Sequence, residues 1–231
     1  MFKRLFGLWH DEDLLQQAYS DAAAMLALAQ EQFKKAISPL LMGAPTDADT
    51  VYSMDRKINA HEIEIRRKVM EHLSIAPKQD TTAALVLTTI AIDIERIGDY
   101  GKNFFELWQL YGAAFCRCPI FDRISEIYSN VVTMFELTLK AFSDADAEIA
   151  RKVMDAHIFN AKNCDEIVAA LVRMPIGADE LAPNQEVLAA LSARYLKRAS
   201  AHLKNIASSV VNPFDRIGFK PPENADFCNT A

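Results

Sequence analysis

The sequence predicts an all-α protein built as two tandem antiparallel three-helix bundles. Glycine is scarce, with 7 residues among 231, and apolar residues make up 51% of the chain, which favours long helices around a sizeable core. Apolar side chains recur at the spacing of one helix face in long segments that Gly and Pro interrupt. The second half repeats the first at an offset of about 100 residues, the length of one three-helix unit.

The first half contains three predicted helices. Asp11 or Asp13 is placed to cap the first helix, which Gly43 ends. The second helix runs from about residue 47 to 73, and the third from about 82 to 111. We assign residues 1–112 to the first bundle, with residues 1–10 as a lead-in.

The second half contains three more predicted helices after a linker at residues 113–119. Ser143 and Asp144 are predicted to cap the middle one, and prolines make residues 213–231 a non-helical tail. The three helices span about residues 121–142, 145–174 and 184–211, within a second bundle at residues 119–212.

Charge, cysteine usage and hydropathy restrict the functional classes. A net charge of −6 argues against nonspecific nucleic-acid binding, because no surplus of cations is present to neutralise phosphates. The four cysteines match no zinc-finger or redox spacing. No apolar run reaches the roughly 18 residues of a membrane span, and the opening segment is too short for a secretory signal. We therefore expect a cytoplasmic protein.

The lead-in at residues 1–10 alternates apolar residues with Lys3 and Arg4. Such a segment suits peripheral contact with a membrane surface or with a membrane partner. The alternative is that its apolar residues pack on the body of the protein.

Acidic residues stand out in the third helix, where Glu95, Asp99 and Asn103 are spaced four apart and share one face. Two carboxylates at this spacing repel each other by a few tenths of a kcal/mol, so water, a basic side chain or a bound cation must compensate. One interpretation is a solvated face paired with Arg66, Lys68 or Lys102. The other is a cation site, since oxygen ligands suit hard metal ions.

The internal repeat shows which acids the fold does not require. Between the third and sixth helices, at an offset of 102, an arginine, a lysine and an asparagine recur in the same order. The acids do not recur, because Lys197 replaces Glu95 and Ala201 replaces Asp99. Asp155 recurs at the position of Asp55, at an offset of 100, and we expect Lys197 to face it as a substitute cation.

The segment Asp93–Tyr100, read Asp-Ile-Glu-Arg-Ile-Gly-Asp-Tyr and followed by Lys102-Asn103, resembles the signature of the PhoU family of phosphate-uptake regulators. Asp55–Glu62 is similar to the matching motif on the preceding helix. Arg194–Arg198 with Lys204-Asn205 resembles a degraded second copy of the signature.

This resemblance implies two PhoU domains that restrain phosphate uptake and phosphate-starvation signalling. Partners in the family are a phosphate transporter, sometimes an ion-coupled carrier, and a histidine kinase. The resemblance also implies a metal ion, either iron, zinc, magnesium or manganese. Its ligands, carried over to this sequence, are Asp55, Asn59, Glu95 and Asp99 in the first bundle. We expect no metal in the second bundle, where only Asp155 survives.

Two local details of the third helix lead to structural predictions. Arg96 lies three residues after Asp93, which predicts an ion pair within the helix. Gly98 in mid-helix costs about 1 kcal/mol relative to Ala, so we expect a close approach of another helix there.

Enzymatic motifs are absent from the sequence. His61, His157 and His202 lie outside any Glu-x-x-His pattern of di-iron bundles, and no Gly-rich phosphate loop occurs. We therefore expect a nonenzymatic regulator that self-associates through leftover apolar stripes. The alternatives are a carboxylate-bridged metalloenzyme, with His61 or Glu62 as acid or base, and a metal-free scaffold at a membrane transporter.

Overall fold

The computed structural model describes residues 13–76, 80–173 and 181–219. In these residues six long α-helices follow one another, and a short 3-10 helix, η1, lies within the segment predicted to be non-helical. The elements are α2 (Leu14–Met42), α3 (Ala48–Ile75), α4 (Thr81–Tyr111), α5 (Pro119–Asp144), α6 (Ala147–Arg173), α7 (Pro183–Val211) and η1 (Phe214–Arg216).

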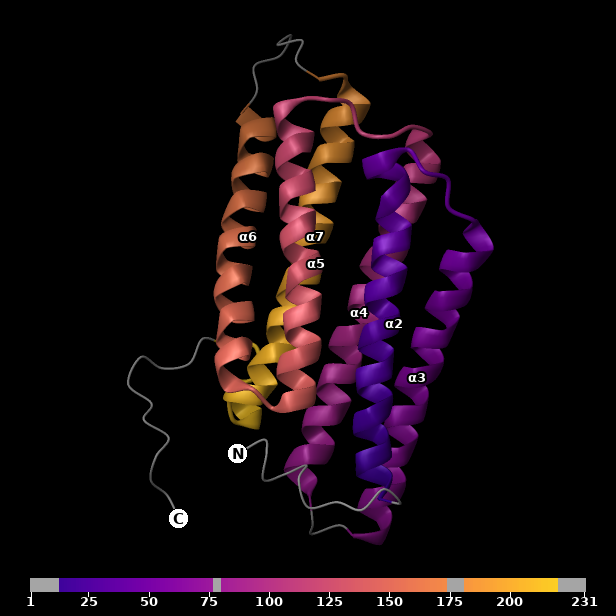
Figure 1. Ribbon diagram of the computed structural model, residues 1–231, viewed down its shortest axis with the longest axis vertical. Helices are drawn as coiled ribbons and strands as arrows, with labels where there is room; N and C mark the ends of the chain where they lie inside the picture. Colours follow the sequence, from indigo (N-terminus) through magenta and orange to yellow (C-terminus); the bar gives the residue numbers. More distant parts are fainter. Residues whose placement is uncertain (1–12, 77–79, 174–180, 220–231) are drawn as a thin grey trace.

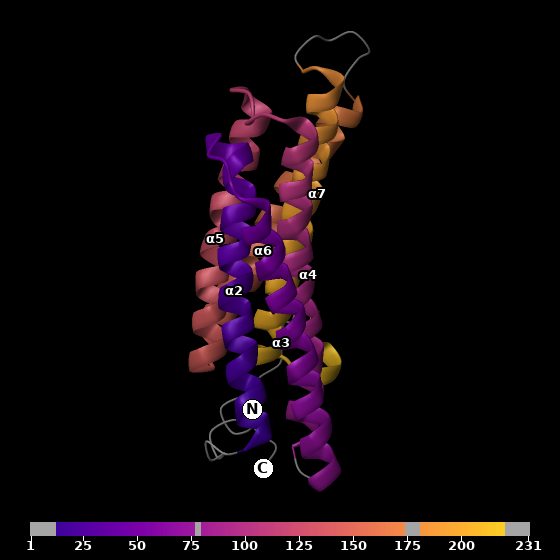
Figure 2. The same cartoon turned by 90° about the vertical axis from the view of Figure 1, so that its right-hand side faces the viewer.

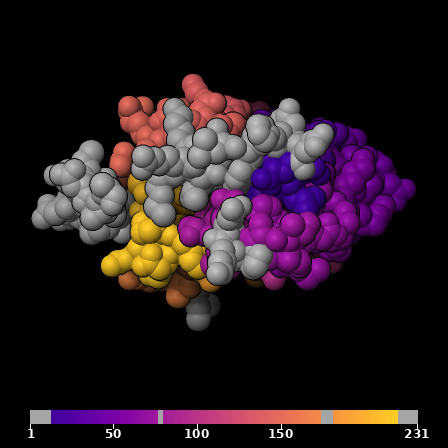
Figure 3. Space-filling view, turned by 90° about the horizontal axis from the view of Figure 1, so that it is seen from below, coloured from indigo at the N-terminus to yellow at the C-terminus, as the bar shows by residue number. Residues whose placement is uncertain are grey.

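The helices form two antiparallel three-helix bundles, as predicted. The bundles lie side by side along their length (Figure 1). Helices α2, α3 and α4 make the first bundle, and α5, α6 and α7 make the second. Helix α4 packs on α7 and α2 packs on α5, whereas α3 and α6 lie at opposite outer edges (Figures 1 and 2). Seen from below, the C-terminal end of α7 lies next to α4 (Figure 3).

Aspartate caps begin the first two helices, and Asp13 is one of the two caps predicted for the first. Asp13 accepts a hydrogen bond from the backbone N–H of Leu15 at 2.9 Å, and Asp47 accepts one from Thr50 at 3.1 Å. Each cap satisfies a backbone donor that has no partner inside the helix, and is worth about 1 kcal/mol.

The predicted cap of α6 is wrong. Helix α5 continues through Ser143 and ends at Asp144, and its C-cap, Ala145, has a left-handed φ of 51°. Asp146 is therefore the cap, and its carboxylate accepts from the backbone N–H groups of Glu148 at 2.9 Å and Ile149 at 3.0 Å. Sequence alone could not choose among three neighbouring cap formers.

The main hydrophobic core runs through both bundles, and a smaller cluster around Phe105 lies beside it in the first bundle. At its centre the ring of Phe33 from α2 lies 5.9 Å from that of Phe104 in α4 and 5.4 Å from that of Phe135 in α5. Phe104 in turn meets Tyr195 of α7 edge to face at 5.4 Å. Burial of each such ring contributes about 2–3 kcal/mol, so the bundles are held together by apolar packing as well as by their connections.

The expected close approach at Gly98 is confirmed. A Cβ atom there would lie 3.1 Å from Ile58 Cδ1 and 3.3 Å from Gln32 Oε1. One turn later, a Cβ at Gly101 would lie 3.4 Å from the backbone of Phe33. The two glycines thus let α4 approach α2 and α3 closely enough to bring polar side chains of α3 and α4 together.

Two further predictions concern residues that lie outside the described part of the chain. These are the lead-in at residues 1–10 and the end of the tail at residues 220–231. Among the described helices, none combines the length and apolar character needed to cross a bilayer.

Candidate functional site

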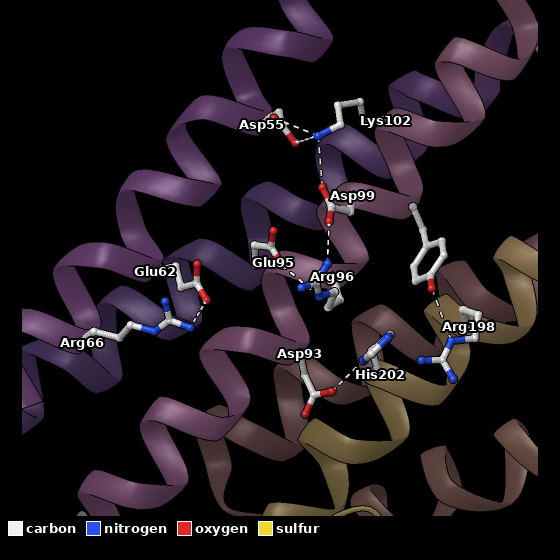
Figure 4. A network of polar contacts seen from close by, with 11 residues as sticks. Asp55, Glu62, Arg66, Asp93, Glu95, Arg96, Asp99, Lys102, Arg198 and His202 are labelled. Atoms are coloured by element: carbon white, nitrogen blue, oxygen red, sulfur yellow. Dashed lines mark hydrogen bonds and ion pairs between the residues drawn. The ribbon is translucent and has the colours of Figure 1, made fainter.

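Lysine 102 joins the acidic residues of α3 to those of α4. Its ammonium lies 3.3 Å from both carboxylate oxygens of Asp55 and 3.0 Å from Asp99 Oδ1 (Figure 4). Because α3 and α4 run antiparallel, Asp55 near the start of α3 lies opposite the last third of α4. Lys102 is three residues after Asp99, so the three charges share one face of the helix pair.

The remaining acids of this cluster also have cationic partners. Arg96 reaches Asp99 Oδ2 at 3.2 Å and Glu95 Oε2 at 3.5 Å. Glu62 on α3 pairs with Arg66 at 2.7 Å, one turn further along the helix. Each carboxylate drawn on this face in Figure 4 is therefore paired with a side-chain cation.

Electrostatics in the cluster favour a charged lysine and disfavour a charged Glu95. Burial raises the pKa of Glu95 above its usual value, and the charges of Asp99 and Glu62 add to this, while Arg96 opposes it. Burial alone would lower the pKa of Lys102, but the hydrogen bond to Asp99 and the charge of Asp55 raise it overall. Lys102 is thus an ammonium at neutral pH.

The predicted metal ligands are only partly brought together. Asp55 and Asp99 converge on Lys102, Glu95 lies beside Asp99, and Asn59 lies half-buried on α3 one turn after Asp55. Their oxygen atoms are of the type that hard cations prefer. The position between the two aspartates, however, is taken by the Lys102 ammonium. Over the described ranges, no three His, Cys, Asp or Glu side chains are grouped to hold a metal.

As arranged, these residues do not fit a metal ion. A metal bound by both aspartates would first have to displace the ammonium of Lys102, losing contacts of 3.0–3.3 Å. The metal site on Asp55, Asn59, Glu95 and Asp99 therefore stays a prediction. Its alternative, an acidic face paired with basic side chains, describes the observed contacts.

The expected contact between Asp155 and Lys197 in the second bundle is wrong. The Lys197 ammonium lies 2.6 Å from both carboxylate oxygens of Asp165 instead. Asp165 is ten residues beyond Asp155 on α6, which is about 15 Å along a helix. Lys197 therefore does not act as a substitute cation for Asp155.

The predicted pair of Asp93 and Arg96 is also wrong, because Asp93 faces the second bundle. Its Oδ1 lies 2.6 Å from His202 Nδ1 and accepts a hydrogen bond from Asn205 Nδ2 at 3.0 Å. The ring of Tyr100 stacks on His202 at 5.9 Å. This buried polar link between α4 and α7 was missed, although a carboxylate within an apolar helix face was a signal for it.

Comparison with protein families decides the identity of this fold. The PhoU domain matches the chain twice, over residues 23–107 and 124–210, which correspond to the two bundles. The chain belongs to the PhoU family. The resemblance carried by the α4 signature is thereby confirmed.

Known PhoU proteins match the chain along most of its length. The phosphate-specific transport system accessory protein PhoU homolog 1 of Thermotoga maritima is 24% identical over 207 residues, which cover 87% of this chain and 88% of that protein. The crystal structure of PhoU from Pseudomonas aeruginosa has a TM-score of 0.72 and 24% identity, covering 86% of this chain and 95% of that one. The phosphate transport system regulatory protein PhoU of Streptococcus pneumoniae has a TM-score of 0.71 and 16% identity, covering 85% and 93%.

Proposed function

We propose that this PhoU protein is a nonenzymatic regulator that restrains phosphate uptake. It acts through contacts with a phosphate transporter or with the histidine kinase that signals phosphate starvation. The observation that carries the proposal is the double match to the PhoU domain. The names of the Thermotoga maritima and Streptococcus pneumoniae proteins, an accessory and a regulatory protein of phosphate transport, agree with it.

A metal-free version of this regulator is favoured by the Lys102 contacts. The acids that a metal would use are already paired with basic side chains of the same bundle. Elemental analysis of the purified protein, with Glu95→Ala and Asp99→Ala as controls, tests the predicted metal. Stoichiometric metal in the wild type that is lost in both variants would establish the site, whereas unchanged trace content would reject it.

The regulatory role is tested by deleting the gene in the cell that encodes it. We expect uptake of radioactive phosphate, and expression of phosphate-starvation genes, to rise in medium rich in phosphate. A plasmid copy of the wild-type gene should restore both to the original level. Unchanged uptake and unchanged expression in the deletion strain would contradict the proposal.

Two associated predictions have direct tests of their own. Self-association is measured by sedimentation of the purified protein across a range of concentrations. Membrane contact by residues 1–10 is measured by co-sedimentation with vesicles that contain anionic lipid, with a variant lacking residues 2–9 as the control.

A further inference from the structure

An exposed apolar strip runs along α3 and α4 of the first bundle. Its members are Ile63, Met70, Leu85 and Ile92, which are 65%, 64%, 41% and 41% exposed. Between the two helices lies a shallow groove of about 360 Å³, whose lining includes Met70, Leu85 and Thr88. The groove joins Met70 to Leu85, and Ile63 and Ile92 lie seven residues from them on the same faces of α3 and α4. Large apolar side chains gathered on a surface in this way are typical of contact sites.

The second bundle provides an internal control for this strip. At the repeat offsets, the positions of Ile63 and Met70 are held by Asn163 and Ala170, and those of Leu85 and Ile92 by Val187 and Arg194. Three of the four counterparts are polar or small, yet α6 and α7 form the same helix pair as α3 and α4. The apolar strip is therefore not a requirement of the three-helix fold.

A region of excess negative charge lies at one end of the strip. The four carboxylates of Asp55, Glu62, Glu95 and Asp99 share three side-chain cations, those of Arg66, Arg96 and Lys102. Glu95 follows Ile92 by three residues. Its ion-pair partner, Arg96, lies at 3.5 Å and is itself more than half exposed. A cation supplied from outside would relieve this charge more effectively than a screened surface pair does.

We propose that Ile63, Met70, Leu85 and Ile92 form the docking strip for an amphipathic helix of a protein partner in phosphate transport. That helix carries two apolar residues seven apart, followed by Lys or Arg one turn later. This spacing matches the residues of α4 that the helix would contact. Leu85 and Ile92 are seven residues, or about 10 Å, apart, and Glu95 lies about 5 Å further along the helix axis. The inference rests on the proposed function for the identity of the partner, and adds the surface and the chemistry of recognition.

Photo-crosslinking in the native cell tests the docking strip. p-Benzoylphenylalanine replaces Thr88, which lines the groove, in the full chain, and replaces the repeat counterpart Ala190 in a control. We expect crosslinking from position 88 to a polypeptide whose linked peptide has the apolar and basic spacing stated above. We expect at least about tenfold less product from position 190, because the partner docks on the first bundle.

A second variant separates loss of docking from loss of folding. Ile63→Asn with Ile92→Arg installs the residues of the second bundle at exposed positions, so the melting temperature should stay within about 2 °C of the wild type. The crosslink from position 88 should fall at least about tenfold in this background.

Several results would overturn the proposal. These are crosslinking of position 88 to a second copy of this chain, to lipid or to a peptide without the stated pattern, equal yields at positions 88 and 190, or no product at all. None of these results would alter the uptake of the deletion strain, so a failure of the docking strip is distinguishable from a failure of the regulatory role.

Discussion

The two bundles place a lysine at the same point of the repeat and use it differently. In the first bundle, Lys102 lies between Asp55 and Asp99 and ties α3 to α4. In the second, Ala201 stands where Asp99 would be, and Lys204 donates to the carbonyl of Gly218. Burial lowers the pKa of Lys204, whereas the neighbouring Asp99 and Asp55 raise the pKa of Lys102. The bundle thus folds with or without the acids, which marks the acidic face as a specialisation of the first bundle.

The largest expected effect concerns the polar link that holds the two bundles together. Asp93→Ala leaves His202 and Asn205 without their shared acceptor in a buried setting, which should cost about 3 kcal/mol of unfolding free energy. Urea denaturation followed by circular dichroism measures this change. The double variant Asp93→Ala with His202→Phe should lose less unfolding free energy than the sum of the losses of the two single variants, because Asp93 and His202 are partners in one contact. A loss below about 0.5 kcal/mol would show that the link is not structural.

A pH effect is expected from His157 in the second bundle. Burial, together with the charges of Lys204 and Lys197, lowers the pKa of His157 from 6.5 to about 4, whereas its counterpart Lys57 is exposed. The unfolded chain therefore binds a proton before the folded one does, so stability is complete above pH 6.5 and falls as pH drops toward 4.

The contribution of His157 should be about 2 kcal/mol at most, after allowance for solvent screening. Unfolding curves at pH 7, 5.5 and 4.5, compared with those of His157→Gln, isolate this contribution. A decline of the same size in both proteins would assign the pH dependence to other groups.

A smaller effect is expected at the lysine of the first bundle. Lys102→Met removes the cation from between two partly buried carboxylates and should cost about 1 kcal/mol. Millimolar Mn²⁺ should then raise the melting temperature of the variant more than that of the wild type, because the variant removes the ammonium from the position between Asp55 and Asp99. An equal rise in both proteins would show that Lys102 and the metal do not compete.

The smallest effect is expected from Lys197→Ala. Its partner Asp165 is largely exposed, and a pair of this kind contributes less than about 0.5 kcal/mol. Thermal unfolding of this variant beside Lys102→Met compares the two lysines directly. If Lys197→Ala costs as much stability as Lys102→Met, the Lys197–Asp165 ion pair stabilises the second bundle as strongly as Lys102 stabilises the first.

The helices and the family could be predicted from the sequence because both depend on local patterns. Apolar spacing and the breaks at Gly and Pro gave six helices, and the α4 signature identified the PhoU family. The close approach at Gly98 followed from the cost of glycine within a helix.

The partners of individual charges could not be predicted in the same way. Arg96 had acids on both sides along the helix, and side-chain rotation and the neighbouring helix decided that it pairs with Asp99 rather than Asp93. Lys197 pairs with Asp165 because of the register between α6 and α7. The spacing of residues along the chain does not reveal that register.

The contrast between the bundles is tested most directly by exchanging one pair of repeat counterparts. Ile92→Arg gives the first bundle the residue of the second, and Arg194→Ile gives the second bundle the residue of the first. Both positions are exposed. Both variants are expressed in the deletion strain, and phosphate uptake is measured in phosphate-rich medium. We predict that Ile92→Arg raises uptake toward the level of the deletion strain and that Arg194→Ile leaves it at the wild-type level. Full restraint by Ile92→Arg, or an equal loss in both variants, would contradict a contact role specific to the first bundle.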